Sequence, residues 1–314
     1  MNQSPTFRLH PLTTFALLVL LTIPFISCTK SGSSSNKNDS TGTGGNGALL
    51  TKEVLVAANS SGTTIDSIVT TYQYNVKNEP SILQQTSTSS ISGDVITTSL
   101  SYNMTYSGNL VTSLTGSYTE SVQTPSETVS STTQISTTFQ SSGGQVVSYI
   151  QTASTSGTPF IPLTPETGND SALLTYDGSG NVSTYTIYEV QPGLTGYQLA
   201  SQENFTYSSS DLSQSVNIIY VAGIAIDTFT TVYQYNTKLS SAPLYIVPGI
   251  AVISLNDLTQ SVVTETGSNA GTVTTAYTTT YNSANQPSSS KATVTTTPSN
   301  PGTIATENIT YTYQ

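Results

Sequence analysis

The sequence predicts an all-β protein: a long antiparallel meander of repeated hairpins with roughly sixteen strands, curled or rolled on itself. From Leu49 onward, short runs of Thr, Val, Ile and Tyr alternate with clusters of Gly, Asn, Ser and Asp, the pattern of strands joined by turns. An aromatic residue returns about every 32 residues, which is the length of two strands and two turns. Either two packed sheets or a rolled half-barrel would cover the tyrosine-bearing face.

Residues 1–27 are predicted to be an export signal. Arg8 supplies a positive charge, and an apolar run over 15–23 follows it and ends before Pro24. Phe25-Ile26-Ser27-Cys28 resembles the bacterial lipobox, although Phe25 and Ile26 depart from its usual residues. The resemblance implies that Cys28, the single cysteine of the chain, is lipidated and becomes the first residue of the mature protein.

Residues 28–48 are predicted to be a flexible tether that begins at the lipidated Cys28. The segment is polar, rich in Gly and Ser, and free of aromatic residues. Loss of residues 1–27 would remove the only Arg and the only His, and would leave a strongly acidic mature chain. The acyl chains, and not basic residues, are therefore expected to attach the protein to the membrane.

Residues 49–314 are predicted to form one β-hairpin-repeat domain. In the segment 273–281, period-two alternation places Val273, Tyr277 and Tyr281 on one face and Thr residues on the other. One face is then aromatic and aliphatic, and the other is hydroxylated and wet. The repeated aromatics are Tyr74, Tyr106, Phe139, Tyr176, Tyr207, Tyr235, Tyr281 and Tyr313.

Two segments interrupt the repeat. The prolines of 158–165 exclude a central strand. The most apolar stretch, 243–258, is expected to be a short irregular or helical plug, with a ligand-binding lid as the alternative.

The turn at 177–181 has two interpretations. Asp177, Ser179 and Asn181 have the spacing at which a Ca²⁺ loop begins, but Tyr188 stands where that loop needs a glutamate. A tight hairpin turn is therefore favoured, and no metal or other cofactor is predicted.

Composition excludes several functions. The formal charge of −10 opposes nucleic-acid binding, which needs clustered Lys and Arg. A mature chain without His and with one Cys cannot build a Ser-His-Asp, Cys-His or Cys/His zinc site. The 49 Ser and 57 Thr make up about a third of the chain, which favours a hydroxylated surface.

Three polar chemistries remain. A carboxylate pair, Glu120 with Glu127 or Asp170 with Asp177, could hydrolyse glycosides. A Ser-Lys dyad would need a desolvated lysine, whereas the lysines sit near strand ends or turns: Lys52, Lys77, Lys238 and Lys291. Tyrosines could stack on sugar rings or pack a partner, but their regular spacing favours a core role.

The Tyr-x-Tyr-Asn/Asp, turn, strand unit is similar to the YD repeats of Rhs-type proteins. The order of lipobox, tether, Tyr-x-Tyr hairpins and late apolar interruption more closely resembles uncharacterised outer-membrane lipoproteins of Bacteroidota. That family implies no known activity, and no toxin domain follows the repeats. Asp66-Ser67-Ile68 and Asp170-Ser171-Ala172 resemble the O-glycosylation acceptor of Bacteroidota, which implies glycans on Ser67 and Ser171.

We therefore predict a non-enzymatic cell-envelope lipoprotein that acts as a structural or binding module. It would be held in the outer membrane by Cys28, facing either the periplasm or the exterior, with a glycan or an envelope protein as partner. The alternative is a glycan-binding accessory or a polysaccharide-acting enzyme. A membrane-embedded barrel is the alternative architecture, but a lipid anchor would then be redundant and the aromatics fall once per hairpin instead of in two girdles.

Overall fold

The computed structural model describes residues 49–91, 93–157, 169–190, 195–209, 211–239, 244–247, 250–252, 256–267, 270–298 and 304–313. Every regular element in these ranges is a strand. The strands are β1 (Leu50–Asn59), β2 (Thr64–Tyr74), β3 (Pro80–Ile91), β4 (Asp94–Ser107), β5 (Leu110–Gln123), β6 (Thr128–Ser142), β7 (Gln145–Gly157), β8 (Asp170–Tyr176), β9 (Val182–Val190), β10 (Tyr197–Ser208), β11 (Asp211–Val221), β12 (Ile224–Leu239), β13 (Leu244–Val247), β14 (Ile250–Val252), β15 (Asn256–Gly267), β16 (Gly271–Tyr281), β17 (Pro287–Thr297) and β18 (Ile304–Tyr313).

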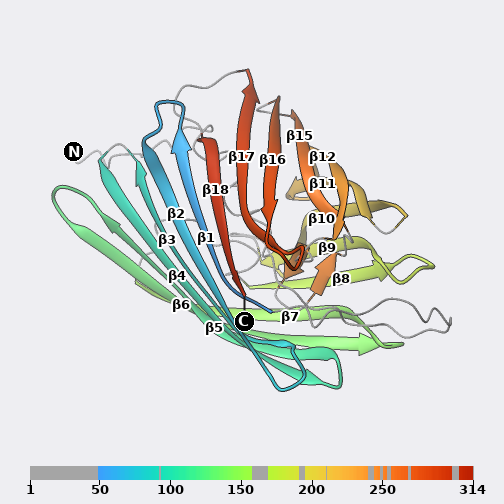
Figure 1. Ribbon diagram of the computed structural model, residues 1–314. Helices are drawn as coiled ribbons and strands as arrows, with labels where there is room; N and C mark the ends of the chain where they lie inside the picture. The colour runs from blue at the N-terminus through green and yellow to red at the C-terminus, as the bar shows by residue number, and fades with distance from the viewer. Residues whose placement is uncertain are drawn as a thin grey trace, which may run out of the picture.

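Sixteen strands form one closed antiparallel barrel (Figure 1). Each strand pairs with its neighbours in the chain, except that β12 pairs directly with β15. The ring closes where β1 pairs with β18, with Leu55 opposite Ile309. The predicted all-β meander is confirmed, but the half-barrel and the two-sheet arrangement are wrong, because pairing of the first and last strands leaves no free sheet edge.

Alternating polarity decides which face of each strand points inward. In β6, Thr133, Ile135 and Phe139 are buried, whereas Gln134, Ser136 and Thr138 are exposed. The cross-strand pairs carry this parity around the whole ring, so one continuous set of residues faces the inside.

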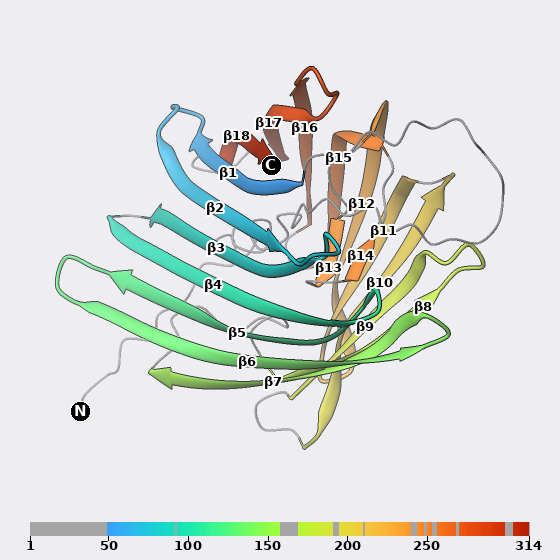
Figure 2. The ribbon, with the colours of Figure 1, turned by 60° about the horizontal axis from the view of Figure 1, so that its bottom comes forward.

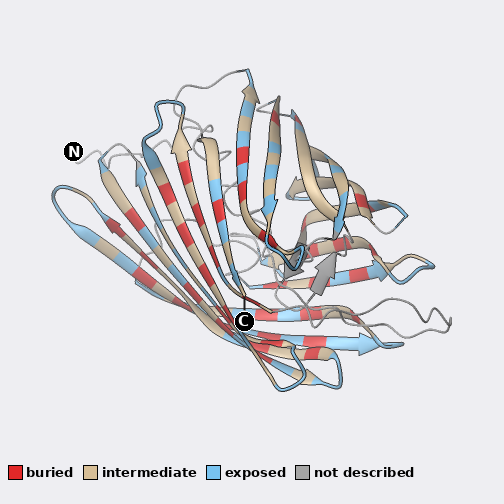
Figure 3. Cartoon of the chain, in the orientation of Figure 1, coloured by how far each residue is buried: buried red, intermediate tan, exposed pale blue. Residues whose placement is uncertain are grey.

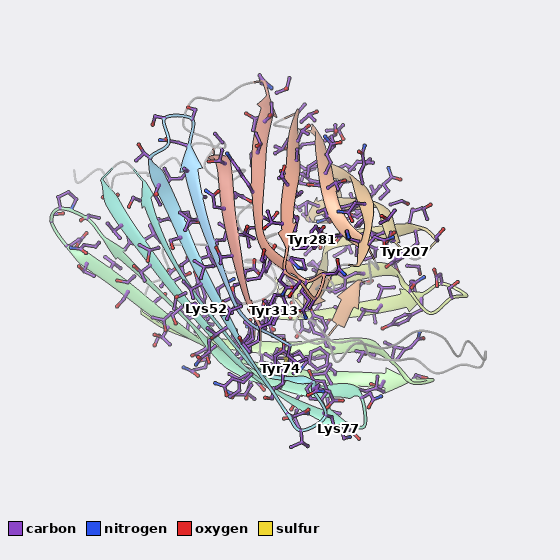
Figure 4. The ribbon with its side chains drawn as sticks, viewed as in Figure 1. Lys52, Tyr74, Lys77, Tyr207, Tyr281 and Tyr313 are labelled. Atoms are coloured by element: carbon purple, nitrogen blue, oxygen red, sulfur yellow. The ribbon has the colours of Figure 1, made fainter. Side chains whose placement is uncertain are left out.

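The repeated aromatics gather at one end of the barrel, called here the tyrosine end. At this end every second strand of the ring finishes, namely β2, β4, β6, β8, β10, β12, β16 and β18. The tyrosine end comes toward the viewer in Figure 2, and Figure 4 labels Tyr74, Tyr207, Tyr281 and Tyr313. The period near 32 residues therefore corresponds to one hairpin of the barrel.

Tyrosine hydroxyls join neighbouring strands at this end. The hydroxyl of Tyr74 donates a 2.7 Å hydrogen bond to the carbonyl of Leu50, where the preceding strand begins. The same bond recurs from Tyr106 to Pro80 at 2.8 Å, from Tyr176 to Val146 at 2.6 Å and from Tyr207 to Val182 at 3.0 Å. In these four hairpins the repeat thus positions a hydroxyl, in addition to the ring that packs against the core.

Three turns at the tyrosine end share one geometry. The side-chain oxygen of Asn75 accepts hydrogen bonds from the backbone N–H groups of Lys77 and Glu79. Asp177 and Asn282 accept the equivalent pairs of bonds from their own turns. The fourth residue of each turn has positive φ, which Asn and Gly adopt at low cost: Asn78, Gly180 and Asn285.

Of the short irregular or helical plug predicted at 243–258, the helical form is wrong. Its described residues form the hairpin β13–β14 and the start of β15, and Figure 2 draws the hairpin within the outline of the ring. Tyr245-Ile246-Val247 and Ile250-Ala251-Val252 are rich in strand-favouring residues and flank Pro248-Gly249, a turn dipeptide. Local chemistry therefore favours a hairpin over a helix. The prolines of 158–165 lie outside the described residues.

Candidate functional site

The inner face of the barrel collects carboxyl groups. The acidic residues at inward positions of the strands are Glu53, Asp66, Glu120, Asp170, Glu189, Glu203, Asp227, Glu265 and Glu307. Lys52 and Lys291 are exposed at outward strand positions, and Lys77 and Lys238 are exposed at the tyrosine end. The described part of the inner face therefore carries charge of one sign.

Burial changes the acidity of these groups. The side chain of Glu53 is only 4% exposed, and desolvation raises its pKa to about 8. Burial also raises the pKa of Glu307, with a further contribution from the nearby carboxyl of Asp66. The interior consequently favours protonated carboxyl groups, which can donate as well as accept hydrogen bonds.

The inner faces of β4–β9 are closely packed. The hydroxyl of Thr137 donates a 2.8 Å hydrogen bond to the side-chain carbonyl of Gln151. Tyr149 makes a 2.6 Å bond with the hydroxyl of Tyr185 and donates a 3.3 Å bond to Asp170. All five side chains are buried, so this sector gives a ligand little to contact (Figure 3).

The inner faces of β10–β12, β15 and β16 are different. Most inward side chains there are half-exposed, and Figure 3 draws these ribbons mainly in the intermediate colour. We call the following set the half-exposed inner face: Glu203, Asn217, Phe229, Thr231, Tyr233, Ser261, Val263 and Tyr277.

A chain of polar groups crosses this face. Ser215 is buried between Glu203 and Tyr233; it hydrogen-bonds to the Glu203 carboxyl, and its hydroxyl lies 3.3 Å from that of Tyr233. Burial raises the pKa of Glu203 to about 7, while the bond from Ser215 lowers it. Three strands thus present a carboxyl group, an amide (Asn217) and a phenol beside the ring of Phe229.

The carboxylate pairs considered from the sequence are not brought together. Glu120 is buried in the middle of β5, whereas Glu127 is exposed in the turn before β6. Asp170 begins β8 and Asp177 follows its other end. The register instead places Asp170 opposite Glu189, but Asp170 is completely buried and hydrogen-bonded to Tyr149.

The structure also locates the candidate lysines and the serines of the predicted glycosylation sites. The four lysines proposed for a Ser-Lys dyad are all exposed, so none of them is desolvated. The side chains of Ser67 and Ser171 face outward on β2 and β8, because Asp66 and Asp170 beside them face inward. Cys28 lies outside the described residues.

Among the described residues, no group of three or more His, Cys, Asp or Glu side chains could hold a metal ion. The Asp177 carboxylate, part of the alternative Ca²⁺ loop, accepts bonds from Ser179 and Asn181 within its own turn, and these lower its pKa. The described chain also contains no helix with the length and hydrophobicity needed to cross a bilayer.

Sequence reasoning missed the Glu203–Ser215–Tyr233 chain. A signal is nevertheless present in β11, where Ser215 and Asn217 alternate with Val216 and Ile218. Here the polar residues face inward and the apolar ones outward, the reverse of β6. Strict alternation reveals two faces but not which of them points inward, because both sets contain residues that either face tolerates.

No protein-family model matches the chain, and no curated protein matches it. Among solved structures, the barrel is similar to a porin-like protein from Bacteroides uniformis, with a TM-score of 0.48 and 12% sequence identity over 84% of this chain and 98% of that one. A similarity at this level says nothing about the function of this chain.

Proposed function

We propose that the protein is a non-enzymatic lipoprotein of the cell envelope that acts as a binding module, attached to the outer membrane through Cys28. The export signal at 1–27, the lipobox and the tether at 28–48 support the anchor. The tether would hold the barrel at the membrane, with its ligand site open to the surrounding water.

The outer wall around β4 and β6 supports a barrel that faces water in this part. The outward positions of β4 include Thr97, Ser99, Ser101, Asn103 and Thr105, and those of β6 are similarly rich in Ser, Thr and Gln. Barrels that span an outer membrane place an apolar band on this face and polar groups inside. In this part of the barrel the polarity is the opposite.

One observation carries the assignment to ligand binding: the half-exposed inner face combines aromatic rings with hydrogen-bonding groups. Phe229, Tyr233 and Tyr277 offer rings, and Glu203 and Asn217 offer polar groups beside them. Rings that pack on the faces of sugars, next to carboxyl and amide groups that bond their hydroxyls, suit a hydroxyl-rich ligand. Among the described inward residues no lysine is present to pair with an anion, so a neutral glycan is the proposed ligand class.

Calorimetric titration with neutral and acidic oligosaccharides tests this proposal. A neutral glycan should bind, and Tyr233→Ala should weaken binding at least about tenfold by removing a ring worth roughly 1.4 kcal/mol or more. Tyr188→Ala, on the outer face of β9, is the matched control and should bind normally. Equal binding by wild type and Tyr233→Ala would refute the assignment.

Polysaccharide hydrolysis is the second candidate, favoured by the register pairing of Asp170 with Glu189. The Cβ atoms of residues directly opposite on adjacent strands lie roughly 5 Å apart, which is compatible with the carboxyl separation of about 5 Å in retaining glycosidases. The complete burial of Asp170 opposes this role. Release of reducing ends by the wild type, abolished in Asp170→Asn, would replace binding with catalysis.

The side of the membrane is decided by protease shaving of intact cells. Loss of the protein while a periplasmic control survives would support display outside the cell. Survival until the envelope is permeabilised, with the purified protein itself cleavable, would support a periplasmic position.

A further inference from the structure

Among the described residues, exposed apolar side chains gather on one flank of the barrel. Apart from Val76 in a turn, the large hydrophobic side chains of the described ranges that have high exposure all lie on β7–β12, namely Ile150, Leu173, Val190, Tyr197, Val221, Ile224, Ile226 and Val232. The polar walls of β4 and β6 show that such residues are not needed to build the strands.

Two neighbouring hairpins concentrate this apolar surface at the end opposite the tyrosines. In the β9–β10 hairpin Val190 pairs with Tyr197, and in β11–β12 Val221 pairs with Ile224. Ile224 is 69% exposed, and the other three are between 44% and 52%. We call these four residues, with Ile226, the apolar tips.

Other hairpins at the same end are polar. The β1–β2 turn passes through Asn59 and Gly62, and the β5–β6 turn through Thr124 and Glu127. The charged residues nearest the apolar tips, Glu189 and Asp227, face inward. Polar residues close a barrel hairpin equally well. The exposed apolar tips therefore indicate contact with another apolar surface or phase.

We propose that the apolar tips insert into the interface of a lipid bilayer. A stable interface between two protein copies buries about 800 Å² on each partner, whereas five such side chains offer on the order of 400 Å². Side chains at the ends of two adjacent hairpins suit a soft, apolar phase that adapts to their shape better than a flat protein surface. The absence of lysine from these described hairpins points to the acyl boundary and not to anionic head groups.

The proposal is compatible with the anchor. Leu50 begins β1 at the tyrosine end, so the tether and the apolar tips leave opposite ends of the barrel. Residues 29–48 can extend to roughly 60–70 Å at about 3.3 Å per residue, which exceeds the roughly 33 Å of a ten-residue strand. The same membrane can therefore hold Cys28 and contact the tips, with the barrel lying on its side or inverted.

The chain has no Trp, so one introduced Trp reports its own surroundings. The test uses residues 29–314, which contain every strand of the closed ring and lack the cysteine. With vesicles of neutral phosphatidylcholine, Ile224→Trp should shift its emission to shorter wavelength and be quenched by lipids brominated on the acyl chain. Val76→Trp, also solvent-facing but at the tyrosine end, should do neither.

Flotation with the same vesicles measures the native tips. The double substitution Val221→Ser with Ile224→Ser should lower the vesicle-bound fraction at least about tenfold, since it removes two aliphatic side chains that would enter the bilayer. An unchanged Ile224→Trp spectrum, or equal responses at positions 224 and 76, would overturn the proposal. A shift that depends on protein concentration and needs no vesicles would also overturn it, by showing a second copy at the tips.

Discussion

Strands β6 and β11 belong to the same hairpin repeat but use their two faces in opposite ways. In β6 the inward residues, such as Thr133 and Ile135, are buried and the outward ones are Gln, Ser and Thr. In β11 the inward Asn217 is half-exposed, and Val216 and Ile218 face outward. One backbone architecture therefore supports a packed sector and a more open one, and the alternation of polarity along each strand decides between them.

The largest expected difference between the sectors is in tolerance to truncation. Tyr102 lies on β4 and is 2% exposed. Tyr102→Ala should lower the free energy of unfolding by about 3–5 kcal/mol, because the substitution leaves a cavity. Tyr233→Ala should cost roughly 1–2 kcal/mol, since its ring is half-exposed. Urea denaturation measures both values, and equal losses would break the distinction between packed and open sectors.

The second-largest loss of stability is expected at a glycine of the packed sector. A Cβ at Gly116 on β5 would lie 2.1 Å from the carbonyl oxygen of Ser101 and 2.6 Å from the ring of Tyr102. Backbone cannot yield cheaply, so Gly116→Ala should cost roughly 2–4 kcal/mol. Gly62→Ala is less suitable as a control, because the φ of 80° at Gly62 strains any residue with a Cβ. Thr115→Ala, on the outer face of the same strand, is the control. A Gly116→Ala protein as stable as this control would contradict the close approach.

Stability should fall as pH rises through neutrality. The pKa of Glu53 is about 8 in the folded protein and 4.5 without burial, so the folded state binds more protons between these values. The contribution of Glu53 is therefore fully present below about pH 4.5 and declines up to about pH 8. Glu53→Gln should raise stability at pH 8 by up to about 4 kcal/mol and leave it nearly unchanged at pH 4.5. Thermal melts at both pH values measure the effect; a wild type that is more stable at pH 8 would contradict it.

The smallest effect concerns the tyrosine end. Tyr176→Phe removes the 2.6 Å bond to the Val146 carbonyl and should cost about 1 kcal/mol. On β6 the register places Ser141 at the equivalent position, so this hairpin has no tyrosine there. Reversible unfolding of Tyr176→Phe, compared with the outward Tyr188→Phe, decides whether the hydroxyls add to the packing of the rings. Identical stability of both variants would show that the repeated tyrosines stabilise the barrel through packing of their rings alone.

Much of the fold could be predicted because its cues are local. The aromatics Tyr74 to Tyr313 mark the end of every second barrel strand, and Asn75, Asp177 and Asn282 lie in turns of the chemistry expected for hairpins. Closure could not be predicted, since pairing Leu55 with Ile309 joins the two ends of the domain. The β13–β14 hairpin could have been predicted from the sequence, because Pro248-Gly249 is a turn signal.

The candidate site was harder to predict than the fold. Glu203, Ser215 and Tyr233 come from three strands and become neighbours only through register, which the sequence does not reveal without knowledge of the inward face. The members of each predicted carboxylate pair are seven residues apart in the sequence. For Asp170 and Asp177 this spacing spans the whole of β8, so the two residues lie at its opposite ends. Glu120 faces inward on β5, whereas Glu127 lies in the exposed turn before β6.

The central claim, that the two sectors differ on their inner faces, is tested most directly by cysteine labelling of residues 29–314. The sequence has no cysteine in this range, so Thr231→Cys on β12 and Thr133→Cys on β6 are matched single reporters at inward positions. Thr133 is completely buried and Thr231 is half-exposed. A small maleimide should therefore label position 231 at least tenfold faster than position 133 in the folded protein, and a neutral glycan that binds should slow only the former. Equal labelling rates at the two positions would contradict the account.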